Sequence, residues 1–100
     1  LIARYLNDQN LKQMAIDQIE WVLGKNPFSS STMYGEGENF HPLYVAFSRQ
    51  LIGALPVGIK TKAETDEPYW PVGNNAVYKE MWGHTTGKFL WVLADILKMK

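Results

Sequence analysis

The sequence predicts an all-α protein whose helices are joined by long, aromatic-rich loops. Two runs of apolar residues recur at helical spacing, one near each end of the chain. Between them, Gly, Pro and Ser interrupt any regular pattern, which indicates loops. The second run is apolar around nearly its whole circumference, and this is typical of a buried helix. We treat residues 1–100 as a single region.

The composition excludes several classes of function. Apolar residues make up 46% of the chain and charged residues 20%, so the chain is expected to pack. Ten basic residues balance ten acidic ones, and we therefore predict no nucleic-acid partner and no membrane partner. The absence of cysteine excludes disulfides, thiolate zinc sites and cysteine nucleophiles. No apolar run approaches the length of a membrane-spanning helix.

The first helical run is bounded by clear signals. Residues 1–7 resemble the end of a helix with nothing before it, so we expect a C-terminal piece of a longer polypeptide. Asp8 or Asn10 can cap the next helix, which the apolar spacing predicts over 10–23. Gly24 suits the position just after the helix, and Pro27 prevents its continuation.

The middle of the chain is predicted to be mostly loop. Over 24–43, Gly35 and Gly37 permit a positive φ or close backbone approach. In residues 43–55 the spacing of the apolar residues matches neither that of a helix nor that of a strand, so this segment is open between the two. The prolines and charges of 56–71 indicate exposed, non-helical structure.

The last helix is predicted to begin near Thr85 or Thr86, with a threonine as its N-cap, and to end at about Lys98. Its apolar residues leave little polar surface for solvent. A chain of this size with so much loop can hardly cover such a helix. We therefore expect neighbouring segments of a larger protein, or a partner chain, to cover it.

Glu80 is the leading candidate for chemistry. It lies between Tyr78 and Trp82, just before the last helix. Aromatic neighbours desolvate a carboxyl group and favour its protonated form, which suits a general acid. The alternative is a glutamate on a solvated turn.

Two acidic groups in the predicted loops raise the question of calcium, which binds oxygen ligands. Their spacing does not resemble an EF-hand, and His41 and His84 lack the spacing of metal ligands. We predict no metal and no cofactor, with calcium as the open alternative. The acidic groups are Glu36 and Glu38, and Glu64, Asp66 and Glu67.

Nine aromatic residues lie between the two predicted helices. An aromatic ring presents a flat apolar face that matches the C–H face of a sugar ring. Most of them are expected to pack the loops onto the helices, and two or three to face a groove. As substrate-binding residues we predict Tyr34, His41, Tyr69, Trp70 and Trp82.

The order of five motifs resembles the C-terminal part of family 9 glycoside hydrolases, more closely their endoglucanase-like bacterial relatives among the six-hairpin glycosidases. The resemblance covers about residues 15–97, and its specificity lies in the order and spacing of the motifs. The motifs are WVLGKNP, STMYGEG, GALPVG, DEPYW and YKEMWGHTTGKFLWVLADI.

The resemblance implies the C-terminal portion of an (α/α)6 barrel, a secreted or periplasmic enzyme, and inverting hydrolysis of a β-linked glucan or related glycan. Glu80 falls on the position of the general acid, with Phe89 nine residues further on as in the family. The substrate is then an oligosaccharide or polysaccharide. The remainder of the parent barrel, or another chain, is the expected cover for the last helix.

Departures from the family pattern leave alternatives open. Lys79 stands where an Asn usually precedes the acid, and Thr32 stands where a Tyr is usual. The His-His-Arg cluster is reduced to His41-Pro42, with Arg49 displaced. The motif that carries the catalytic base has no counterpart in these 100 residues, so the isolated chain is expected to be inactive. A non-catalytic carbohydrate-binding or scaffold module, or another (α/α)6 glycosidase or polysaccharide lyase, remains possible.

Overall fold

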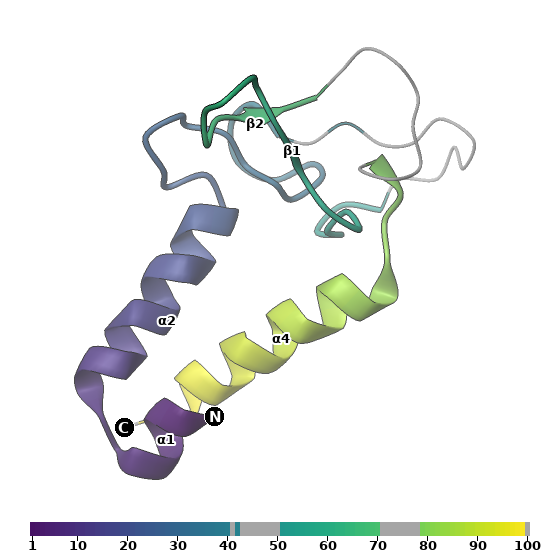
Figure 1. Cartoon of the computed structure of the whole chain (residues 1–100). Coiled ribbons are helices and arrows are strands. Elements are labelled where there is room, and N and C mark those ends of the chain that lie inside the picture. The colour runs from purple at the N-terminus through teal and green to yellow at the C-terminus, as the bar shows by residue number, and fades with distance from the viewer. Residues whose placement is uncertain (41, 43–50, 71–78, 100) are drawn as a thin grey trace.

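The computed structural model describes residues 1–40, 42, 51–70 and 79–99. Over these residues the elements are the helices α1 (Ile2–Leu6), α2 (Gln9–Val22) and α4 (Gly83–Leu97) and the short strands β1 (Lys60–Thr61) and β2 (Pro68–Tyr69). Figure 1 shows α2 and α4 converging near α1 and leading, at their other ends, into the loops. The mainly helical prediction is confirmed, and a two-stranded antiparallel hairpin is added to it. Whether these helices belong to a barrel stays a prediction.

The junction between α1 and α2 follows from two side chains. Asn7 adopts a left-handed conformation with φ 51° and ends α1. The carboxylate of Asp8 then accepts hydrogen bonds from the backbone N–H groups of Asn10 (2.8 Å) and Leu11 (3.1 Å). These bonds occupy N–H groups that the first turn of α2 leaves unpaired. Asp8, one of the two predicted caps, is thus the N-cap, and α2 begins one residue earlier than predicted.

The end of α2 has the hydrogen bonds of a Schellman motif. Gly24 has φ 98°, and its N–H donates to the carbonyl of Trp21 at 3.1 Å. The N–H of Lys25 donates to the carbonyl of Glu20 at 2.9 Å. The Lys25 ammonium also pairs with the Glu20 carboxylate at 2.7 Å. The predicted role of Gly24 is confirmed, because a left-handed residue is required here.

The start of α4 differs from the prediction. The helix begins at Gly83, its N-cap is Trp82, and no side chain caps it. Thr85 and Thr86 therefore lie within the first turn. The hydroxyl of Thr86 accepts a hydrogen bond from the N–H of Leu55 at 3.1 Å instead of capping the helix. The Thr86 hydroxyl oxygen, predicted to cap its own helix, thus bonds to a residue distant in the sequence.

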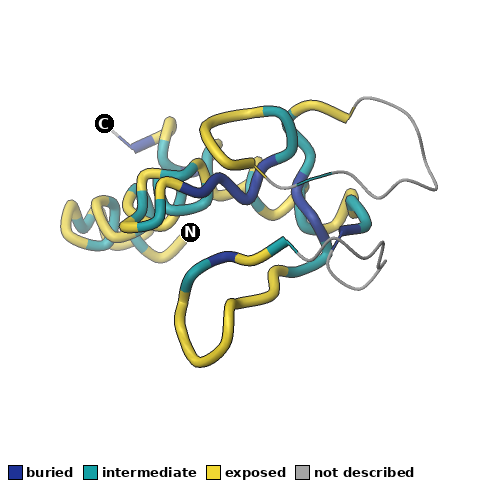
Figure 2. Tube along the Cα trace, turned by 90° about the horizontal axis from the view of Figure 1, so that it is seen from above, coloured by how far each residue is buried: buried dark blue, intermediate teal, exposed yellow. Residues whose placement is uncertain are grey.

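Within this chain α4 is largely uncovered, as expected for so apolar a helix in a chain of this size, and its burial by other segments stays a prediction. Asp95 is its buried residue, whereas the side chains of Trp91 and Leu97 are 64% and 77% exposed. In the described part of the chain, α1 and α2 reach only part of the α4 surface. Figure 2 shows the buried stretches mainly where the loops meet, while the helices are largely intermediate or exposed.

Polar contacts hold the converging ends of the helices together. The Asp95 carboxylate lies 2.8 Å from the amino group of Leu1 and 3.1 Å from the Arg4 guanidinium. The Lys12 ammonium donates to the carbonyl of Met99 at 2.9 Å, which joins α2 to the end of the chain. Within the described residues, no helix combines the length and the apolar character needed to cross a membrane.

Candidate functional site

The loop after α2 is organised by the side chain of Asn26. Its amide nitrogen donates to the carbonyls of Trp21 and Ser30, each at 2.9 Å. Its amide oxygen accepts from the N–H groups of Phe28 (3.1 Å) and Ser30 (3.3 Å). One side chain therefore joins the last turn of α2 to the beginning of the loop. This explains the Asn of the LGKNP motif as a structural residue.

The next segment, residues 31–37 with the motif STMYGEG, is called the glycine loop. It folds back onto the end of α2. Thr32 donates to the carbonyl of Val22 through both its N–H (2.9 Å) and its hydroxyl (3.1 Å). Ser31 is fully buried, and its N–H donates to the carbonyl of Glu38 at 3.0 Å. A Cβ on Gly37 would lie 2.9 Å from the Leu23 carbonyl oxygen and 3.0 Å from the Ser31 Cβ. Packing within the chain thus accounts for this glycine without a bound sugar.

Residues 53–57 join two other motif segments side by side. On one side, the N–H of Tyr34 donates to the Ala54 carbonyl at 3.0 Å, and the N–H of Gly53 donates to the Tyr34 carbonyl at 2.9 Å. On the other side, the N–H of Val57 donates to the Glu80 carbonyl at 2.8 Å. An antiparallel bridge between Pro56 and Met81 lies beside this bond. The glycine loop, the GALPVG segment and the Glu80 segment are therefore neighbours in one layer.

The hairpin brings the DEPYW motif to the same end of the molecule. β1 pairs with β2 in antiparallel register, with Lys60 opposite Tyr69 and Thr61 opposite Pro68. The indole N–H of Trp70, just after β2, donates to the carbonyl of Asn39 at 3.3 Å. In Figure 1 the hairpin lies among the loops beyond the ends of α2 and α4. All five motif segments thus meet at the end of the molecule where α2 ends and α4 begins. We call this end the loop end.

Glu80 is half-buried, and its carboxylate accepts a hydrogen bond from the indole N–H of Trp82 at 2.8 Å. The neighbouring Lys79 is only 6% exposed. Glu80 and Trp82 flank Met81, which forms the bridge to Pro56, and the hydrogen bond shows that their side chains lie on the same side of the chain. Two aromatic neighbours were predicted for Glu80. Trp82 is described in the structure, and Tyr78 lies outside the described residues.

Of the predicted sugar-binding aromatics, Tyr34 packs edge-on against Phe40, with ring centroids 5.8 Å apart. Tyr69 and Trp82 are 41% and 46% exposed. Trp70 is half-buried beside the glycine loop. These four residues lie on hydrogen-bonded neighbouring segments. The fifth predicted residue, His41, lies outside the described residues.

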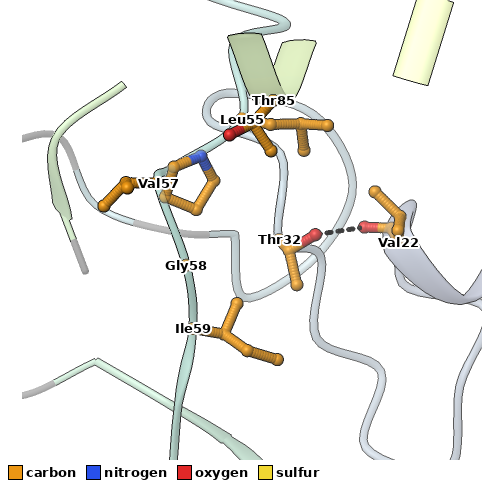
Figure 3. A pocket seen from close by; sticks show the side chains of 8 residues that line it. Val22, Thr32, Leu55, Val57, Gly58, Ile59 and Thr85 are labelled. Carbon is orange, nitrogen blue, oxygen red and sulfur yellow. Dashed lines mark hydrogen bonds between the residues drawn. The ribbon is translucent and has the colours of Figure 1, made fainter. Parts of the chain in front are cut away.

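A pocket of about 190 Å³ lies between the end of α2 and the start of α4 (Figure 3). Its Thr32 hydroxyl is already bonded to Val22, and most of its wall is aliphatic. A sugar hydroxyl buried there would find few polar partners, and this is costly. The exposed aromatic side chains are therefore the better candidate contacts for a glycan. The pocket is lined by Val22, Thr32, Leu55, Pro56, Val57, Gly58, Ile59 and Thr85.

The acidic residues that raised the question of calcium lie mostly on the surface of the loops. Glu36, Glu38, Glu64 and Asp66 are exposed, and Glu67 pairs with Lys62 at 3.7 Å. In the described ranges, three or more His, Asp or Glu side chains do not gather in a way that could hold a metal ion.

Two polar residues that the sequence did not single out are important in the structure. Asn26 has a sequence signal, because an Asn shortly after a helix-ending Gly often bonds to nearby backbone groups. The burial of Asp95 has no such signal, because it depends on contacts with Leu1 and Arg4 at the other end of the chain.

Comparison of this chain with protein-family models, with curated proteins and with solved structures gave no match.

Proposed function

We propose that this chain is the C-terminal part of an inverting glycoside hydrolase and that Glu80 is its general acid. The observation that carries the proposal is the convergence of the five motif segments at one end of the helices. The backbone bonds from Tyr34 to residues 53 and 54, and from residue 57 to Glu80, bring three of them together. A half-buried carboxylate and exposed aromatic rings then lie on neighbouring segments. This is the combination that a glycosidase cleft requires.

In this mechanism Glu80 donates its proton to the glycosidic oxygen as the bond to the sugar breaks. A second carboxylate on the opposite face of the sugar ring activates water, and in inverting enzymes the two carboxyl groups lie about 6.5–9.5 Å apart. The second carboxylate is assigned to the rest of the parent protein. The hydrogen bond from Trp82 uses Oε2 of Glu80, so Oε1 is the oxygen assigned to proton donation.

The proposed substrate is a β-linked glucan or a related glycan. Tyr69 and Trp82 have the exposed ring area that stacking on a sugar requires, and Tyr34 and Trp70 support the same loops. Gly37 has no proposed contact with the glycan, because its packing against Leu23 and Ser31 accounts for it.

The parent barrel is the proposed cover for the exposed helix faces. Two apolar cavities of about 380 and 300 Å³ both have Leu1 in their lining. Ile2 and Tyr5 line the first, and Trp91 and Val92 line the second. Exposed apolar surface of this extent is typical of an interaction site.

The test is the substitution Glu80→Gln in the protein that contains this chain. General acid catalysis contributes about 10²- to 10⁴-fold, so kcat on a glycan with a poor leaving group is expected to fall by that factor. An aryl glycoside with a good leaving group needs little protonation and is expected to retain most of its rate. The control is Glu36→Gln, because Glu36 is exposed on the glycine loop and has no proposed role. Near-normal kcat of Glu80→Gln on the poor leaving group would remove Glu80 from this role.

A non-catalytic carbohydrate-binding module is the second candidate. The observation that favours it is the Glu80–Trp82 hydrogen bond, because a carboxylate held by an indole also suits a binding residue. Calorimetric titration with cello-, xylo- and mixed-linkage oligosaccharides, combined with product analysis, separates the two. Binding without cleavage supports the module, and an unsaturated uronic product would indicate a lyase instead.

A further inference from the structure

Trp82 does more at this site than expose an aromatic ring. Its backbone N–H donates to the carbonyl of Leu55 at 3.2 Å, which fixes the main chain immediately before α4. The backbone carbonyl of Glu80 is held by the N–H of Val57 at 2.8 Å. Both residues are therefore attached to the same neighbouring segment, and their side chains lie on the same side of the chain.

The two side chains contact each other directly. The indole nitrogen of Trp82 lies 2.8 Å from Oε2 of Glu80, the length of a hydrogen bond to a charged acceptor. An indole nitrogen only donates, so this bond orients the carboxylate without competing for its proton. No capping side chain stands at the start of α4, and within the described residues the indole is the partner shown for Glu80.

We infer that Trp82 is a positioning residue for the proton donor, acting through its indole N–H. This inference rests on the proposed function of Glu80. By holding Oε2, Trp82 limits rotation of the carboxyl group and presents Oε1 to the glycosidic oxygen. The role differs from the sugar stacking predicted for Trp82, which requires only its ring face.

The first experiment tests the contact by NMR of the indole N–H groups in the protein that contains this chain. The Trp82 signal is assigned by its disappearance in Trp82→Phe. It is expected to move in Glu80→Gln, because a neutral amide oxygen is a weaker acceptor than a carboxylate. Trp70 is the control, because its N–H bonds to the carbonyl of Asn39, which this substitution leaves in place. A Trp82 signal that behaves like that of Trp70 would overturn the inference.

The second experiment tests the role in catalysis. Trp82→Phe keeps an aromatic ring and the backbone bond to Leu55 but removes the donor. We expect kcat to fall about tenfold or more with KM nearly unchanged, since a hydrogen bond to a charged group is lost. The loss should be smaller on a substrate with a good leaving group. Trp82→Ala, which also removes the ring, is expected to raise KM only if the ring stacks on the sugar.

The outcomes separate this inference from the proposed function. Normal kcat in Trp82→Phe, together with a strong loss in Glu80→Gln, overturns the positioning role and leaves Glu80 as the acid. Near-normal kcat in Glu80→Gln overturns the proposed function itself. A loss in Trp82→Phe that appears equally on good and poor leaving groups also counts against positioning of the acid, because proton donation matters little for the good one.

Discussion

At the loop end, Ser31 is fully buried and Leu55 is 5% exposed, whereas along α4 the side chains of Trp91 and Leu97 are 64% and 77% exposed. The irregular region thus buries its side chains more completely than the regular one. A helix pairs most of its backbone groups internally, so it can form while its apolar face remains uncovered. A loop has no such internal ladder, and its backbone groups must find partners elsewhere. Here Asn26, Thr32 and residues 53–57 provide those partners.

The comparison suggests where a glycan cleft would lie. The loop end has a fixed backbone and carries Glu80 with its exposed aromatic neighbours. The helix faces offer apolar surface that suits packing against another segment. We therefore expect substrate at the loop end and protein neighbours along α1 and α4.

The largest expected effect tests this difference with matched leucines. Leu55→Ala in the loop end removes a buried side chain and is expected to lower the free energy of unfolding by about 2–5 kcal/mol. In the isolated chain, Leu97→Ala on α4 should change it by less than about 0.5 kcal/mol, because that side chain is exposed there. Urea denaturation followed by circular dichroism measures both. In the protein that contains this chain, a larger cost for Leu97→Ala is expected, because another segment is proposed to cover α4.

A smaller effect is expected from two glycines with left-handed backbone. Gly37→Ala would place its Cβ 2.9 Å from the Leu23 carbonyl oxygen at φ 78°, and we expect a loss of about 3 kcal/mol. Gly53→Ala has φ 86° with open space around the Cβ, so only the backbone term of about 1 kcal/mol remains. The same denaturation series measures the difference. Equal losses would show that the glycine loop does not pack against α2 as described.

The mildest effect concerns Asp95 at the converging helix ends. In the isolated 100-residue chain, the hydrogen bond from the Leu1 amino group, opposed by burial and supported by the positive charge of Arg4, lowers the pKa of Asp95 from its ordinary value of 3.8. A lowered folded-state pKa means that the contribution to stability is present above pH 3.8. It is lost as the pH falls below 3.8 and through the folded-state pKa. Thermal unfolding of wild type and Asp95→Asn between pH 7 and pH 2 measures it.

In that series the wild type should lose its advantage over Asp95→Asn in the acid range. Arg4→Met should reduce the advantage, because it removes one of the two cationic partners. A constant difference between wild type and Asp95→Asn at every pH would contradict the ion pair.

The sequence alone determined the helices and the way the first two are bounded. Asp8 and Gly24 act through hydrogen bonds with backbone groups a few residues away. Such local contacts can be predicted from the sequence. The sequence misplaced the start of α4, because Thr86 bonds to Leu55 across 31 positions rather than within its own turn. It also predicted that this chain cannot cover the apolar surface of α4 by itself, and the exposure of Trp91 and Leu97 agrees with that.

The tertiary structure decided which residues meet. The sequence pointed to Glu80 and Trp82 separately, as an acid and a stacking ring, and the structure puts the indole N–H on the carboxylate. The sequence likewise contained the five motifs and their order. The structure added that residues 53–57 bond to Tyr34 on one side and to Glu80 on the other, which brings these two residues close together. Such contacts depend on the path of the whole chain, and no local propensity encodes them.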